Sequence, residues 1–157
     1  MKNNYLNIYN NLIKLTRNKN LYLNLKNNDT FSDRLIVFLF HFAFFLKAYK
    51  DQISKKEAQM IFDFIIRQIE LSIREIGYGD VSVNKKMKDY VNLFFSIIEK
   101  TDKWENFEKS TKIELLADFM NIKDDNDLFI NYFDKYIEYL SNNTLKNFTK
   151  DIIELKF

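Results

Sequence analysis

Proline and glycine, the residues that most often turn a chain, are almost missing from this sequence. Its 157 residues include no proline and only two glycines, Gly77 and Gly79. Sheet-rich folds need many tight turns, and tight turns favour Gly and Pro. Long helices joined through Asn, Asp and Lys need few of either residue. The sequence therefore predicts an all-α fold.

Length and composition indicate one folded domain. A chain of this length amounts to about one domain and can bury a hydrophobic core without metals or cross-links. Hydrophobic residues make up 46% and charged residues 29%, which is not the composition of a disordered protein. The chain has no cysteine, which excludes disulfides and thiolate metal sites. We expect a single all-α domain over residues 1–157 that includes helices in 111–157.

Apolar residues recur at helical spacing along nearly the whole chain. Residues 19–29 are ambiguous between a short helix and an extended connection, and a short helical piece is expected around Trp104 and Phe107. The expected architecture is a bundle of six or seven helices. Their predicted ranges are about 4–17, 30–50, 54–77 and 84–100, with further helices starting near 110, in the Asp-rich stretch 124–127 and near 144.

Several helix ends carry capping residues. Thr30 is placed to accept a hydrogen bond from the amide three residues on. Ser54 and Thr111 each have a Glu three residues later, which is the pattern of a capping box, and Ser110 is an alternative cap to Thr111. Gly77 is expected just past a helix C-terminus, where glycine is common.

The most apolar run, residues 35–46, contains the only histidine, His41. This run is too short for a membrane span, which needs about 18–20 apolar residues. It predicts a buried core helix in which His41 is hydrogen-bonded to a neighbour, and burial argues against haem binding by this residue. A single histidine also excludes His-rich metal sites and Glu-x-x-His di-iron motifs.

Known catalytic motifs are missing from the sequence. There is no nucleophile elbow or P-loop, and Gly77-x-Gly79 lacks the third glycine of a dinucleotide loop. The pair Asp125-x-Asp127 lacks the further oxygen ligand and the glycine of an EF-hand loop, and an Asp-rich prenyl-diphosphate motif fails at Leu128. We therefore expect no enzyme, no metal and no cofactor.

Basic residues gather in two places. Residues 1–28 carry Lys2, Lys14, Arg17, Lys19 and Lys26 and no acid, and a solvated basic face is the ordinary explanation. Near residue 84 the sequence predicts the first turn of a helix that would contain Lys85, Lys86 and Lys88. Cations at this end of a helix are unfavourable by a few tenths of a kcal/mol each. Either an anionic partner compensates for them or the surface simply tolerates them.

The segment 74–88 resembles the most distinctive stretch of the ubiquinol–cytochrome c chaperone family. The stretch Asp29-Thr30-x-x-Asp33-Arg34, which leads into the apolar helix with His41, is similar to another marked stretch of that family. One helix fills the spacing between the two, and the resemblance covers about residues 5–110. The residues that carry it are Arg34, His41, Arg74, Glu75, Gly77, Gly79, Asp80, Ser82, Val83, Lys85 or Lys86, Met87 and Lys88.

The resemblance implies a non-enzymatic chaperone that binds newly made cytochrome b and promotes assembly of respiratory complex III, the ubiquinol–cytochrome c oxidoreductase. It also implies that a small partner protein and peripheral contact with the membrane or the ribosome are to be considered. The chain lacks the long N-terminal extension of the mitochondrial relatives and has Asn84 where proline is common. The missing extension suggests a bacterial-type, cytoplasmic member, with a peripheral position at the inner membrane as a further expectation, and argues against ribosome contact.

Two other functions stay open at this stage. One is a helical interaction module that binds nucleic acid or an anionic membrane through basic helices. The other is an all-α enzyme of isoprenoid or quinone chemistry. Within the chaperone hypothesis, Arg34, Arg74, Glu75 and Asp80 form a network that braces the loop after Gly77. The contact surface is then the face of Lys85, Lys86 and Lys88.

Overall fold

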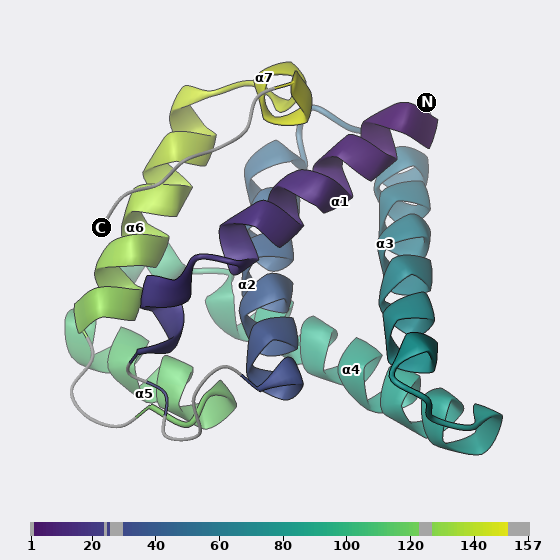
Figure 1. The fold of residues 1–157 in the computed structure, drawn as a ribbon. Coiled ribbons are helices and arrows are strands. Elements are labelled where there is room, and N and C mark those ends of the chain that lie inside the picture. The colour runs from purple at the N-terminus through teal and green to yellow at the C-terminus, as the bar shows by residue number, and fades with distance from the viewer. Residues whose placement is uncertain (1, 24, 26–29, 123–126, 151–157) are drawn as a thin grey trace.

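The computed structural model describes residues 2–23, 25, 30–122 and 127–150. Within these ranges the chain forms seven α-helices and two short 3-10 helices, which confirms the predicted all-α bundle (Figure 1). The α-helices are α1 (Lys2–Thr16), α2 (Phe31–Tyr49), α3 (Lys55–Glu75), α4 (Asp80–Thr101), α5 (Lys109–Phe119), α6 (Asp127–Asn142) and α7 (Leu145–Lys150). The 3-10 helices are η1 (Lys19–Tyr22) and η2 (Trp104–Asn106).

Helix α2 forms the centre of the bundle because it is apolar nearly all round. It packs against α1, α4 and α6, and twelve of its residues are buried. Phe42 stacks on Phe94 of α4 with ring centroids 4.9 Å apart, and Phe40 meets Phe133 of α6 at 5.6 Å. The buried hydrophobic residues form one cluster to which all seven α-helices contribute.

The predicted N-caps of the second and third helices are confirmed. The Thr30 hydroxyl accepts a hydrogen bond from the Asp33 amide at 3.1 Å, and the Ser54 hydroxyl accepts one from the Glu57 amide at 3.1 Å. Each cap satisfies an amide that has no partner within the helix. The apolar run 35–46 lies inside α2, as its length predicted.

Two predicted helix starts are wrong. Helix α4 begins at Asp80 rather than near residue 84, because Gly79 takes the extended N-cap conformation with φ −72° and ψ 165°. Helix α5 begins at Lys109 after the N-cap Glu108, so Ser110 and Thr111 lie inside the helix rather than capping it. Neither N-cap makes a side-chain capping bond, and caps of this kind leave no pattern in the sequence.

Part of the ambiguous segment 19–29 lies among the described residues. It starts as the 3-10 helix η1 with Leu21 and Tyr22 buried, and Leu25 then forms an isolated antiparallel bridge with Ile122. In the Asp-rich stretch only Asp127, in the first turn of α6, is described, and the start predicted at 124–126 lies outside the described residues.

Helices α3 and α4 form a helical hairpin at one side of the bundle, and Phe62 of α3 stacks on Phe94 of α4 with ring centroids 5.8 Å apart. Helix α1 crosses in front of α2, α6 lies on the side opposite α3, and α7 lies at the top of the view beside α1 (Figure 1). The turn between α3 and α4 is therefore at a corner of the molecule, at the lower right of the figure. This position separates it from the aromatic centre around α2.

Candidate functional site

The turn between α3 and α4 depends on one of its two glycines. Gly77 has φ +107°, a conformation that L side chains rarely adopt, and its amide donates to the Arg74 carbonyl at 3.0 Å. Gly79 has an ordinary negative φ, and a Cβ placed on it would meet nothing within 4 Å. Of the two glycines, only Gly77 is therefore required by its backbone conformation.

Arg74 links the end of α3 to the start of α4. Its Nη1 atom lies 2.5 Å from Asp80 Oδ1, and its Nη2 atom lies 3.4 Å from Glu70 Oε1. The bond to Asp80 is the main reason that the pKa of Arg74 is raised. Glu70 also pairs with Arg67, and this bond lowers the pKa of the Glu70 carboxyl. Sequence reasoning missed Glu70, although its position four residues before Arg74 is the spacing of a helical ion pair.

The other two members of the expected bracing network lie elsewhere. Glu75 is exposed at the last position of α3, and the acid that pairs with Arg74 on this helix is Glu70. Arg34 stands at the start of α2, where it lines a cavity of about 160 Å³ between α1, α2 and α3. This cavity is mostly apolar, and Arg17, which directly follows α1, also lines it.

The three lysines do not occupy the first turn of α4. That turn runs from Asp80 to Val83, and its acid suits the positive end of the helix dipole. The argument from unfavourable cations therefore fails, because the helix starts earlier than predicted. Lys85 and Lys88 are exposed, whereas Lys86 is half-buried and its Nζ atom lies 4.5 Å from the centre of the Tyr78 ring.

Val83 and Met87 anchor the lysine-bearing segment to the core. Val83 is fully buried, and Met87 is half-buried against the hydrophobic cluster. Because these two residues are four apart, they share one face of α4. Lys85 and Lys88 project from another face, which leaves them free to meet a partner.

Exposed apolar side chains concentrate on the α3–α4 hairpin. Of the eight large hydrophobic residues that are exposed in the described part of the chain, six belong to α3, α4 or the turn between them. Scattered single apolar residues are normal on a protein surface, whereas their concentration on this hairpin makes it the candidate binding surface of the described residues. The six are Met60, Leu71, Ile76, Tyr78, Val81 and Phe95.

His41 is a buried core residue with both ring nitrogens bonded. Its Nδ1 atom lies 2.8 Å from the Val37 carbonyl, which can only accept, so Nδ1 carries the proton. Its Nε2 atom therefore accepts from the Tyr132 hydroxyl at 2.5 Å. Burial lowers the pKa of His41 to about 4, and the ring is neutral at neutral pH. Tyr136 donates to the His41 carbonyl at 2.9 Å, which ties α6 to α2 a second time.

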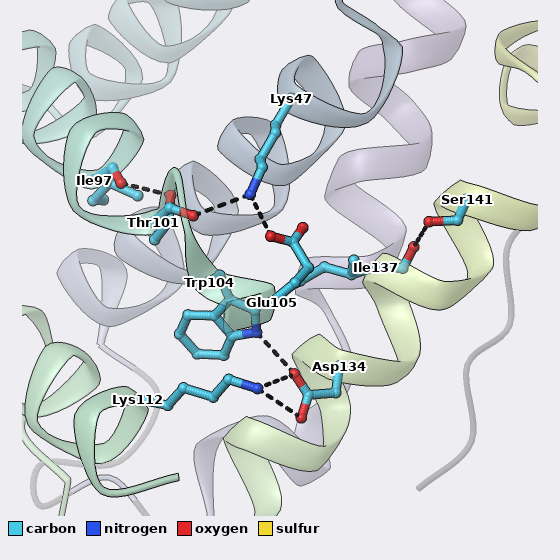
Figure 2. A network of polar contacts seen from close by, with 9 residues as sticks. All are labelled: Lys47, Ile97, Thr101, Trp104, Glu105, Lys112, Asp134, Ile137 and Ser141. Carbon is cyan, nitrogen blue, oxygen red and sulfur yellow. Dashed lines mark hydrogen bonds and ion pairs between the residues drawn. The ribbon is translucent and has the colours of Figure 1, made fainter. Parts of the chain in front are cut away.

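A second polar network joins α2, the end of α4, η2, α5 and α6 (Figure 2). Asp134 accepts from the Trp104 indole nitrogen at 2.8 Å and from Lys112 at 3.1 Å. Lys47 lies 2.6 Å from Glu105, and it also donates to the Thr101 carbonyl at 3.4 Å. These contacts satisfy polar groups around a fully buried tryptophan, so the network is structural.

The described residues contain no cluster of three or more His, Asp or Glu side chains that could hold a metal ion. In the same part of the chain, no helix combines the length and the apolar character needed to cross a bilayer. What the geometry provides is therefore a candidate binding surface on the α3–α4 hairpin, with its turn held by Arg74, Gly77 and Val83.

Comparison with known proteins gives one match. No curated protein and no solved structure matches the chain. The model of the ubiquinol–cytochrome c chaperone family matches residues 23–120, which is more than half of the chain and includes α2, α3, α4 and α5. The matched region contains the turn with Arg74 and Gly77, the lysines that follow it, and His41. The chain therefore belongs to the ubiquinol–cytochrome c chaperone family.

Proposed function

We propose that this protein is a non-enzymatic chaperone that binds newly made cytochrome b and promotes assembly of the ubiquinol–cytochrome c oxidoreductase. The observation that carries the proposal is the family match over residues 23–120. The concentration of exposed apolar residues on the α3–α4 hairpin supports it, because a protein that shelters membrane segments needs accessible apolar surface.

The functional unit is proposed to be the whole described bundle rather than the matched region alone. Helices α6 and α7 follow residue 120, yet α6 packs on α2 and α7 packs on α1. Phe133 and Phe148 are fully buried in the same cluster as the aromatic residues of α2. Removing these helices would expose that cluster, so a fragment ending at residue 120 is not a suitable test protein.

A strain that lacks the gene tests the proposal. Membranes of this strain should lose the haem b absorbance of cytochrome b and the assembled complex, whereas other respiratory haems should remain. A plasmid copy of the wild-type gene should restore both signals, which controls for secondary mutations. Unchanged cytochrome b in the deletion strain would contradict the proposal.

Direct contact with the client is tested by crosslinking. A photoreactive residue in place of exposed Met60 or Phe95 should capture newly made cytochrome b. The same residue in place of Leu23, which is exposed on a connection outside the hairpin, is the matched control. We expect capture from the hairpin positions only, and equal capture from all three positions would argue against the hairpin as the client surface.

A further inference from the structure

The turn end of the α3–α4 hairpin is the most continuously exposed part of the two helices. Every residue from 75 to 82 is exposed, and the nearest buried residues on either side are Ile73 and Val83. Three of the exposed residues are large and apolar. Ile76 is 51% exposed, Tyr78 42% and Val81 85%. Because these side chains lie beyond the last core contacts of both helices, the core does not account for them.

Lysines border these apolar side chains on α4. Lys85 and Lys88 follow Val81 by four and seven residues, so all three lie on one face of the helix. Lys86 is held over the Tyr78 ring.

Few acids offset this positive charge. Between residues 75 and 88 the acids are Glu75 and Asp80, and Asp80 is paired with Arg74. The next acid along α4 is Asp89, which follows Lys85 by four residues and therefore offsets one lysine, so that Lys86 and Lys88 remain in excess. The surface beside the turn is therefore apolar at its end and positively charged behind that end.

We infer that residues 75–88, here called the hairpin tip, dock on a bilayer surface that contains anionic phospholipids. In this arrangement Ile76, Tyr78 and Val81 enter the boundary between headgroups and acyl chains, and Lys85 and Lys88 pair with lipid phosphates. Tyrosine is a common residue at this depth because its ring is apolar and its hydroxyl remains hydrated.

A bilayer suits the shape of the tip better than a helical segment of a protein does. The tip is a turn at a corner of the molecule (Figure 1), whereas a docked helix needs a groove that receives its apolar face. A protruding apolar end with lysines behind it fits a flat surface with an apolar interior and anionic headgroups. The inference rests on the proposed function, because it states where the chaperone meets the membrane that receives its client.

Co-sedimentation of the purified full-length protein with vesicles tests the inference. The vesicles contain equal parts of phosphatidylcholine and phosphatidylglycerol, and phosphatidylcholine vesicles serve as the uncharged comparison. Val81→Asp should lower the partition coefficient about tenfold, because it removes one apolar side chain from the boundary. Lys85→Glu with Lys88→Glu should lower it at least about 25-fold, since each lysine near an anionic surface is worth about fivefold.

Matched variants away from the tip control for charge and hydrophobicity. Leu23→Asp changes an exposed apolar residue, at 66% exposure, and Lys55→Glu with Lys56→Glu reverses two exposed lysines at the far end of α3. Both control proteins should bind anionic vesicles as the wild type does. The tip variants should still fold, because Val81 lies in the first turn of α4, where an acid is favourable. Thermal unfolding by circular dichroism checks this.

Each outcome decides the inference separately from the proposed function. The membrane inference is overturned if the wild type fails to bind anionic vesicles or binds uncharged vesicles equally well. It is also overturned if the tip variants and the control variants lose the same amount of vesicle binding. If the tip variants bind vesicles normally but no longer capture cytochrome b, the tip is a protein-binding surface and the inference is again overturned. If vesicle binding follows the tip while the deletion strain keeps its cytochrome b, only the proposed function fails.

Discussion

Mild acid should destabilise this protein through His41. The ring is fully buried, and its pKa falls from 6.5 in the unfolded chain to about 4 in the folded one. Between these two values the unfolded state binds the proton and the folded state does not, so folding stability falls as the pH falls. The loss amounts to about 2 kcal/mol at about pH 5 and about 3 kcal/mol below both pKa values.

Urea unfolding at about pH 7 and about pH 5 measures this loss, since few other groups titrate between them. The fluorescence of Trp104 reports unfolding because this only tryptophan is fully buried. His41→Gln supplies the control. That variant should be less stable at both pH values, because it disturbs the bonds to Val37 and Tyr132, but it should lose much less stability between them. An equal pH-dependent loss in both proteins would refute the assignment to His41.

Three further predictions concern the turn, a helix cap and the polar network around Trp104. Gly77→Ala should lower the free energy of unfolding by about 1 kcal/mol, because residue 77 has a positive φ. Gly79→Ser should raise the free energy of unfolding by a few tenths of a kcal/mol, because the serine hydroxyl supplies a capping oxygen for α4. Equal effects of the two substitutions in urea unfolding would contradict these different roles. Ser54→Ala removes a cap and should lower stability by about 1 kcal/mol, measured in the same way. Asp134→Asn keeps an acceptor for the Trp104 indole but removes the negative charge, so it should lower the free energy of unfolding by about 1 kcal/mol in thermal unfolding. An unchanged stability would show that the charge is unimportant.

The fold could be predicted largely from local rules. Missing proline and scarce glycine predicted helices, and the capping oxygens of Thr30 and Ser54 predicted where two of them begin. The buried position of His41 followed from the length and apolar character of its segment. These features succeed because they act within a few residues of each other. Tyr132, which forms the hydrogen bond to His41, lies 91 residues away in the sequence. No local pattern identifies a contact over that separation.

The candidate site was harder to predict because it depends on where one helix begins. Without a capping side chain, the sequence did not indicate that α4 starts four residues before the predicted position. This shift moved the lysines out of the first turn and replaced them there with Asp80. The network around Trp104 was also missed, since Lys47, Lys112 and Asp134 come from three separate helices.

The residues marked by the family resemblance divide into two groups once they are placed in the structure. Arg74, Gly77 and Val83 have contacts or conformations that fix the turn, so folding alone explains them. Lys85 and Lys88 are exposed, and the neighbouring apolar residues Ile76 and Val81, which lie outside the residues that carry the resemblance, are exposed as well. Folding does not require an exposed apolar residue at the end of a helical hairpin. The residues that fix the turn therefore hold the exposed lysines and apolar side chains in position. Folding does not explain these exposed residues, whereas binding to a partner would.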